Sequence, residues 1–190
     1  MTTPKQKTTS AEFWDFVHLP ENADKNFERI NGEIVEEMPS NPLSSEIASY
    51  LIRIIGNFVD ANGRYARITG EQGGYDVTDD DTFAPDVAVI LKSRQSRFSD
   101  EGFNPIPPDF AIEVISPSDL KNPKRIREKL EAYQKVKVPL VWLLYEHRRQ
   151  VEVYAYGQLI RTAEIEDTLD GSDVLPGFTL AVKAIFQAVE

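Results

Sequence analysis

Two stretches of the chain carry apolar residues at helical spacing. Ile47, Leu51, Ile54, Ile55 and Phe58 recur every three or four residues, which predicts a helix with a serine as its N-cap and Asn62-Gly63 at its end. Residues 120–136, LKNPKRIREKLEAYQKV, predict a second helix of roughly four turns. Each helix therefore has one apolar face that can pack on a sheet.

Short apolar or alternating runs elsewhere predict strands. The pattern indicates two strands within residues 26–38, joined at Asn31-Gly32, a strong hairpin signal. The other runs cover residues 64–70, 73–79, 83–93, 110–115, 139–145, 149–156 and 159–165, and a turn at Pro176-Gly177 comes before a short amphipathic end. Asp79-Asp80-Asp81 is predicted to be a solvated turn, and residues 94–108 a polar loop.

The second predicted helix connects two buried strands, 110–115 and 140–145. A helical connection of this length joins parallel strands through a right-handed crossover. We therefore expect a mixed α/β sheet with helices on its faces. Residues 26–190 are expected to form a single domain, and residues 1–25 a partly disordered N-terminal lead.

Composition narrows the chemistry. The 190 residues include no cysteine, which excludes disulfides, thiolate nucleophiles and zinc ribbons. The two histidines, His18 and His147, are far apart in the sequence, so no histidine cluster offers a zinc site. No apolar run approaches the roughly 20 residues of a membrane span, and the N-terminus lacks the apolar core of a secretory signal. We therefore expect a cytoplasmic protein without membrane contact.

The chain is acidic, with a net charge of −10 from 21 Lys and Arg and 31 Asp and Glu. This balance disfavours a general nucleic-acid coat, because non-specific affinity comes from cations that neutralise phosphates. A nucleic-acid enzyme of this composition requires a local basic patch or bridging metal ions.

Two carboxylates stand in apolar strand runs. Glu113 interrupts FAIEVI, and Asp86 opens the run that follows Pro85. Because side chains alternate between the faces of a strand, the two can converge on one face if the strands are neighbours. Lys129 lies at the edge of the apolar stripe of the second helix, which directs it toward the sheet. Two carboxylates suit Mg²⁺, and a lysine can orient or deprotonate a water or stabilise developing charge.

Each of these residues also has an ordinary structural interpretation. Asp86 can be a turn residue, and Glu113 can form a structural ion pair with Lys129 or an arginine. Lys129 can extend past Leu130 to solvent. Spacing alone leaves these alternatives open.

Six segments in order resemble the Uma-two family. They are GEIVEEMP, APDVAVI, PPDFAIEVISPSD, REKLEAYQKVKVPLVWLL, VEVY and LPGF. That family is similar to the PD-(D/E)XK, or restriction-endonuclease-like, nuclease superfamily. The resemblance extends from about Glu28 to about Phe186. It implies a restriction-endonuclease-like core, with a mixed central β-sheet flanked by helices and an N-terminal β-hairpin.

The resemblance also implies roles for particular residues. Asp86 is the aspartate of the PD element, and Glu113 is the acidic residue of the (D/E)XK element. Ile115 stands where the lysine of that motif would be, and the lysine function points instead to Lys129 in the following helix. Family members often have a histidine near the start of the first helix, where this chain has Ser44-Ser45.

Four further residues are candidates with weaker support. Glu46 and Glu71 are auxiliary candidates for supporting a metal ion, and for Glu71 an ordinary strand-end residue is the slightly favoured interpretation. Arg125 and Arg127 are candidates for phosphate contacts, with solvated helix charges as the alternative.

Sequence and resemblance together predict a Mg²⁺-dependent (or Mn²⁺-dependent) endonuclease that hydrolyses phosphodiester bonds in DNA. Asp86 and Glu113 would bind metal, and Lys129 would position or activate the water. A homodimer is expected, because two-fold symmetry suits the cutting of two strands. Two alternatives remain: a catalytically inactive binding or scaffold protein on the same fold, and a nuclease subunit of a mobile-element or defence system that needs an unknown protein partner for its DNA contacts.

Overall fold

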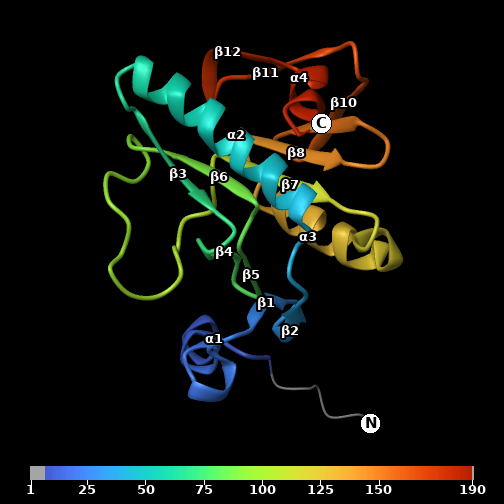
Figure 1. The fold of residues 1–190 in the computed structure, drawn as a ribbon. Helices are drawn as coiled ribbons and strands as arrows, with labels where there is room; N and C mark the ends of the chain where they lie inside the picture. The colour runs from blue at the N-terminus through green and yellow to red at the C-terminus, as the bar shows by residue number, and fades with distance from the viewer. Residues whose placement is uncertain (1–6, 190) are drawn as a thin grey trace.

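A central six-stranded sheet forms the core of the protein (Figure 1). A computed structural model describes residues 7–189. The strand order is β10-β9-β8-β7-β6-β3, with β3 at Ala66–Gly70, β6 at Val87–Leu91, β7 at Phe110–Ile115, β8 at Leu140–Tyr145, β9 at Gln150–Ala155 and β10 at Gln158–Ala163. The β7–β8 pair is parallel and the other neighbours in this sheet are antiparallel, so the expected mixed sheet is confirmed.

Helices cover both faces of this sheet. On one face, α2 (Pro42–Ala61) buries its apolar stripe against alternate residues of the strands, such as Ile112 and Val114. On the other face, α3 (Pro123–Lys135) packs against the intervening residues, such as Ala111 and Val141. This double coverage explains why β7 and β8 are apolar along their whole length. The predicted crossover from β7 through α3 to β8 is confirmed.

The start of α2 differs from the prediction. Its N-cap is Asn41, whose side chain accepts a hydrogen bond from the Ser44 N–H at 3.0 Å, and Pro42 occupies the first turn. Proline is favoured there because its missing N–H has no helical partner. The predicted serine cap is therefore wrong, and Ser44 lies inside the first turn, buried.

A second, four-stranded sheet lies at one end of the molecule in the order β2-β1-β5-β4. Its strands are β1 (Asn26–Ile30), β2 (Glu33–Glu37), β4 (Tyr75–Thr78) and β5 (Asp81–Phe83). The predicted hairpin at Asn31-Gly32 is confirmed, with positive φ at both residues. Asp81 does not lie in a solvated turn as predicted. It begins β5, is 7% exposed, and accepts a hydrogen bond from the Asn31 N–H at 2.8 Å.

The N-terminal segment contains two short helical elements that were not predicted. Helix α1 (Ser10–Val17) and a 3-10 turn, η1 (Pro20–Asn22), lie within residues 1–25, the lead that was expected to be partly disordered, and residues 1–6 lie outside the described residues. Thr9 and Glu12 form a reciprocal capping box at the start of α1. Phe13 is 1% exposed and stacks on Phe103. These local contacts fix a helix too short to show a clear apolar period in the sequence.

The C-terminal segment lies at the opposite end of the molecule (Figure 1). It consists of β11 (Thr168–Gly171) and β12 (Leu175–Ala181), neither of which was predicted as a strand, and of the short helix α4 (Val182–Gln187), which forms the expected short amphipathic end. Pro176 and Gly177 lie near the start of β12 rather than before it, and Gly177 adopts φ +84. A short 3-10 turn, η2 (Asp119–Lys121), precedes α3. Within residues 7–189 no helix is both long and apolar enough to cross a membrane.

Candidate active site

Asp86 and Glu113 face each other across the β6–β7 pair. The antiparallel register joins Val87 to Ile112, so one further step places Asp86 opposite Glu113. Asp86 also accepts a hydrogen bond from the Val114 N–H at 2.6 Å. Directly opposite residues of an antiparallel pair have side chains on the same face. Both carboxylates therefore lie on the face of the sheet that α3 covers.

Lys129 of α3 points into the protein. Its Nζ lies 2.8 Å from Glu113 Oε2 and 2.9 Å from Glu28 Oε1, and its side chain is 14% exposed. The same atom is 5.5 Å from the centre of the Phe83 ring. Lys129 therefore does not extend past Leu130 to solvent. The Glu113–Lys129 ion pair that the sequence left open is present, and it lies beside Asp86.

Tyr133 completes the environment of Glu113. Its hydroxyl donates a hydrogen bond to Glu113 Oε1 at 2.6 Å, one helical turn after Lys129 on α3. Burial, and then the charge of Glu113, hold the pKa of Tyr133 well above its usual value, so it remains a donor. Tyr133 was not among the candidate residues singled out from the sequence, and this contact was not predicted. The hydroxyl of a tyrosine one turn from an inward lysine is the signal that could have found it.

The N-terminal hairpin contributes two carboxylates that the sequence analysis also missed. Glu28 on β1 is 4% exposed and pairs with Lys129 and, at 3.4 Å, with Arg125 Nη2. Glu37 on β2 forms a second ion pair with Arg125. Glu28 shares a strand face with the buried Ile30, so the alternation in β1 was the available signal. Arg125, a candidate phosphate contact, is thus already held by two carboxylates.

The buried charges shift one another's pKa values. Burial and the nearby Glu113 raise the pKa of Asp86 to about 7. Burial also raises the pKa of Glu113, although Lys129 opposes this. For Lys129, burial disfavours the charge, but attraction to Glu113, Glu28 and Glu37 outweighs it and raises the pKa. Lys129 is therefore an ammonium ion at neutral pH, beside two carboxylates with an excess of negative charge.

The pair Asp86 and Glu113 fits a hard divalent cation. Within residues 7–189 no group of three or more His, Cys, Asp or Glu side chains is arranged to hold a metal ion. Mg²⁺ needs no such cage, since it keeps several waters and often takes only one or two carboxylates plus phosphate oxygens. Burial, and then the charge of Glu113, raise the pKa of Asp86, and a bound cation would offset both effects. The two side chains also open onto a cleft with room for water and substrate.

This cleft has a volume of about 910 Å³. It lies between α1 with the β1–β2 hairpin on one side and the ends of β6 and β7 with α3 on the other. Its charged lining comprises Lys25, Glu28, Glu37, Glu71, Asp86, Glu113, Asp119, Arg125 and Lys129. Six carboxylates thus face three Lys and Arg side chains. The charged part of the lining is therefore mainly acidic, and it lacks the basic patch that a nucleic-acid enzyme of this composition would otherwise use.

The remaining predicted residues divide into two groups. Glu71 lines the cleft, and its charge contributes to the raised pKa of Asp86, after burial and Glu113. Glu46 is exposed on α2 and does not line the cleft, although Ser44-Ser45 does. Arg127 is likewise exposed and lies outside it. His18 is at the cleft, whereas His147 is not.

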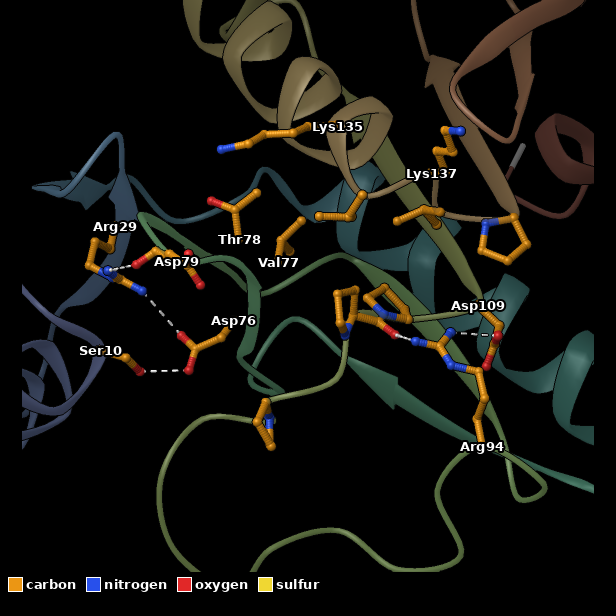
Figure 2. Close-up of a pocket in the computed structure, with 16 residues that line it drawn as sticks. Ser10, Arg29, Asp76, Val77, Thr78, Asp79, Arg94, Asp109, Lys135 and Lys137 are labelled. Carbon is orange, nitrogen blue, oxygen red and sulfur yellow. Dashed lines mark hydrogen bonds and ion pairs between the residues drawn. The ribbon is translucent and has the colours of Figure 1, made fainter.

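A second pocket, of about 890 Å³, lies between β4, the loop before β7 and the end of α3 (Figure 2). Its buried arginine, Arg29, donates to Thr82, Asp76 and two backbone carbonyls. Arg94 is paired with Asp109 at 2.6 Å. The two arginines are thus paired with carboxylates, and Lys135 and Lys137 also line this pocket. The candidate chemistry lies in the other cleft.

A mixed sheet with one carboxylate entering β6, a second within β7 and a lysine on the next helix defines a restriction-endonuclease-like α/β protein. The model of the Uma2 family, described as "Putative restriction endonuclease", matches residues 13–183, and the chain belongs to this family. This confirms the resemblance found in the sequence.

Comparison with solved structures gives the same fold. The chain is similar to a crystal structure of a "putative nuclease belonging to DUF820" from Anabaena variabilis ATCC 29413. The two are 24% identical, with a TM-score of 0.78 over 96% of this chain and 99% of that one. At this identity the likeness establishes the fold alone. A comparison with curated proteins found no match.

Proposed function

We propose that this protein is a Mg²⁺-dependent endonuclease that hydrolyses phosphodiester bonds in DNA. The observation that carries the proposal is the convergence of Asp86, Glu113 and Lys129 in one cleft, from three separate elements. Membership of the Uma2 family supports the reaction class. Mn²⁺ would serve in place of Mg²⁺, since it also prefers oxygen ligands.

Asp86 and Glu113 would hold the metal ion. When bound, a divalent cation supplies a water of lowered pKa and neutralises charge on the scissile phosphate. The Val114 N–H fixes one oxygen of Asp86, and Tyr133 and Lys129 fix both oxygens of Glu113. These contacts hold the two carboxylates in place before substrate arrives, which lowers the reorganisation needed in the transition state.

Lys129 would act as a hydrogen-bond donor and a positive charge. Its raised pKa keeps the ammonium form, so deprotonation of water by Lys129 is disfavoured. From its position beside Glu113 it can orient the attacking water and stabilise the charge that develops on the phosphate oxygens. Of the two roles expected from the sequence, positioning is thus the one the electrostatics support.

The test is a cleavage assay with supercoiled, linear and single-stranded DNA in Mg²⁺ or Mn²⁺. Wild type should cleave, and Asp86→Asn, Glu113→Gln and Lys129→Met should each lose about 10²-fold or more of the activity. Glu131→Gln and Lys124→Met are matched controls, because both residues are exposed on α3 outside the cleft. Cleavage that survives in all three site variants would refute the assignment.

One observation favours a second candidate, a nuclease subunit whose DNA contacts come from a partner protein. Arg125 and Lys129, two of the three cations that line the cleft, are both engaged by carboxylates. A subunit of this kind would bind metal at Asp86 and Glu113, measured by calorimetry, and yet would not cleave any of the DNA forms alone. The predicted homodimer stays a prediction, which sedimentation analysis of the purified protein would test.

A further inference from the structure

Aromatic rings form part of the lining of the cleft. Trp14 on α1 and His18 just after it have ring centres 4.1 Å apart, and Phe103 from the β6–β7 loop meets Trp14 edge to face at 5.1 Å. All three rings line the same cleft as Asp86 and Glu113. The candidate active site therefore has an aromatic wall that the proposed chemistry does not use.

This wall is not explained by packing alone. Phe13 attaches α1 to the rest of the protein, since it is 1% exposed and stacks on Phe103 with centres 5.0 Å apart. Trp14, the next residue, is only partly buried, and His18 is exposed. The His18 Nδ1–H donates to the Trp14 carbonyl oxygen at 2.7 Å, because a carbonyl can only accept. This bond holds the imidazole against the indole while leaving both rings at the cleft surface.

The charge of the cleft limits how it can hold DNA. Six carboxylates face three Lys and Arg side chains, and Arg125 and Lys129 are in ion pairs. Affinity for duplex DNA comes mainly from many cations on phosphates, which this lining does not offer. A volume of about 910 Å³ is in the range of sites for small ligands, so it accommodates a few nucleotides. Binding of DNA in this cleft therefore needs a favourable interaction other than the neutralisation of phosphates.

We propose that Trp14 and His18 form a stacking platform for an unpaired base, so that the site acts on single-stranded or locally unpaired DNA. An unpaired base has a free π-face that an aromatic ring can cover, whereas bases within a duplex are already stacked on each other. The platform would hold the strand beside Asp86 and Glu113. This inference rests on the proposed function, because it names the substrate of that same cleft.

The first test measures the affinity of labelled oligonucleotides of about 10 nucleotides, within the range that single-strand sites cover. Fluorescence anisotropy is recorded with Ca²⁺ in place of Mg²⁺, using a single strand, its duplex, and the same strand with abasic positions. The base-containing single strand should bind about tenfold or more tightly than the other two, and Trp14→Ala should remove that advantage. Trp14→Phe, which keeps a ring, should restore most of it.

The second test uses the chain's own fluorescence. The protein has two tryptophans, and Trp142 is completely buried in β8, so Trp14 alone can report on the cleft. Saturating single strand should quench wild type but not Trp14→Phe, and the abasic strand should quench neither. Phe16→Ala is the control, because Phe16 lies on α1 and does not itself line the cleft, although it packs on Phe27, which does. It should lose thermal stability without changing the preference for base-containing strands.

The two proposals fail in different ways. If cleavage depends on Asp86 and Glu113 while Trp14→Ala binds and cuts the single strand like wild type, the platform is refuted and the nuclease stands. Equal binding of duplex and single strand, or equal binding of the abasic strand, also refutes the platform. If the protein cleaves nothing but Trp14 still reports base-dependent binding, the platform stands and the nuclease proposal falls.

Discussion

Glu28 of the N-terminal hairpin holds Lys129 of α3, with 2.9 Å between Glu28 Oε1 and Lys129 Nζ. Burial alone would raise the pKa of Glu28, but Lys129, Glu37 and Arg125 outweigh burial and lower it. The carboxylate is therefore ionised where it meets the lysine. The hairpin thus belongs to the candidate site, even though it lies outside the central sheet.

Glu28→Gln should reduce cleavage about 10–100-fold, the usual effect of removing a group that orients a residue of the site. In this variant the Lys129 ammonium would still pair with Glu113, but it would lose its ion pair with Glu28, which also fixes the position of Lys129. The same assay with Glu36→Gln, an exposed neighbour of Glu37 on the hairpin, should give wild-type rates. Wild-type activity in Glu28→Gln would show that Glu113 alone positions Lys129.

Lys129→Met should destabilise the fold by about 3–5 kcal/mol, measured by urea unfolding. The substitution leaves Glu28 and Glu113 buried without their shared cation. Lys124→Met, in an exposed i,i+4 pair on the same helix, should change stability by less than about 0.5 kcal/mol. A loss for Lys129→Met no larger than that of its control would contradict the buried arrangement.

Tyr133→Phe should cost about 1.5–3 kcal/mol of stability, because it removes a hydrogen bond to an ionised group. The ring remains in place against Phe83, so packing is preserved. The rate of cleavage should fall as well, since only one of the two Glu113 oxygens, the one that contacts Lys129, would still be held in place. Chemical denaturation and initial rates on the same preparation would measure both effects, and an unchanged stability would argue against the contact.

Glu37 should make the stability of the protein depend on pH. Burial, followed by the neighbouring Glu28, raises the pKa of Glu37 to about 8, against the opposing charges of Lys129 and Arg125. Near pH 7 Glu37 is therefore mostly a neutral carboxyl that accepts a hydrogen bond from Arg125, and the contact becomes a full ion pair only above about pH 8. A carboxyl with a raised folded-state pKa stabilises the fold fully below its unfolded pKa, near 4.5, and that contribution is lost as pH rises through about 8.

The corresponding measurement is the free energy of unfolding between pH 5 and 8. Glu37→Gln should flatten the decline seen in wild type, by at most about 1.4 kcal/mol per pH unit for one proton. Glu36→Gln is again the matched control. Parallel pH profiles for wild type and Glu37→Gln would show that Arg125 keeps Glu37 ionised throughout.

Asp86→Asn should have opposite effects with and without metal. In metal-free protein near pH 8 it should raise Tm, because burial and Glu113 make the Asp86 charge unfavourable, as its pKa of about 7 indicates. Each kcal/mol of added stability raises Tm by roughly 2–4 °C in a domain of this size. Added Mg²⁺ or Mn²⁺ should stabilise wild type but not the variant, since a ligand raises Tm only if the native state binds it. A metal-induced shift that persists in Asp86→Asn would place the metal elsewhere.

Local patterns predicted the parts of the fold that depend on short stretches of chain. The helix through Ile47 and Leu51, the hairpin at Asn31-Gly32 and the crossover between β7 and β8 were all predicted. The predictions failed where other contacts outweighed local preference. Asp81 was taken as solvated because three acidic residues in a row usually are, yet it is buried against the Asn31 N–H of the facing hairpin.

By itself the sequence determined the two carboxylates and the lysine as a candidate set, because strand alternation and helical spacing fix the direction of a side chain within its own element. It could not determine their partners. The contacts of Lys129 with Glu28, and of Arg125 with Glu37, join α3 to a hairpin far away in the chain. Such contacts depend on how separate elements pack, and so do the protonation states that follow from burial and neighbouring charge. Only the tertiary structure decided that Lys129 is a buried ammonium ion shared by two carboxylates, and that an aromatic wall from α1 faces the same cleft.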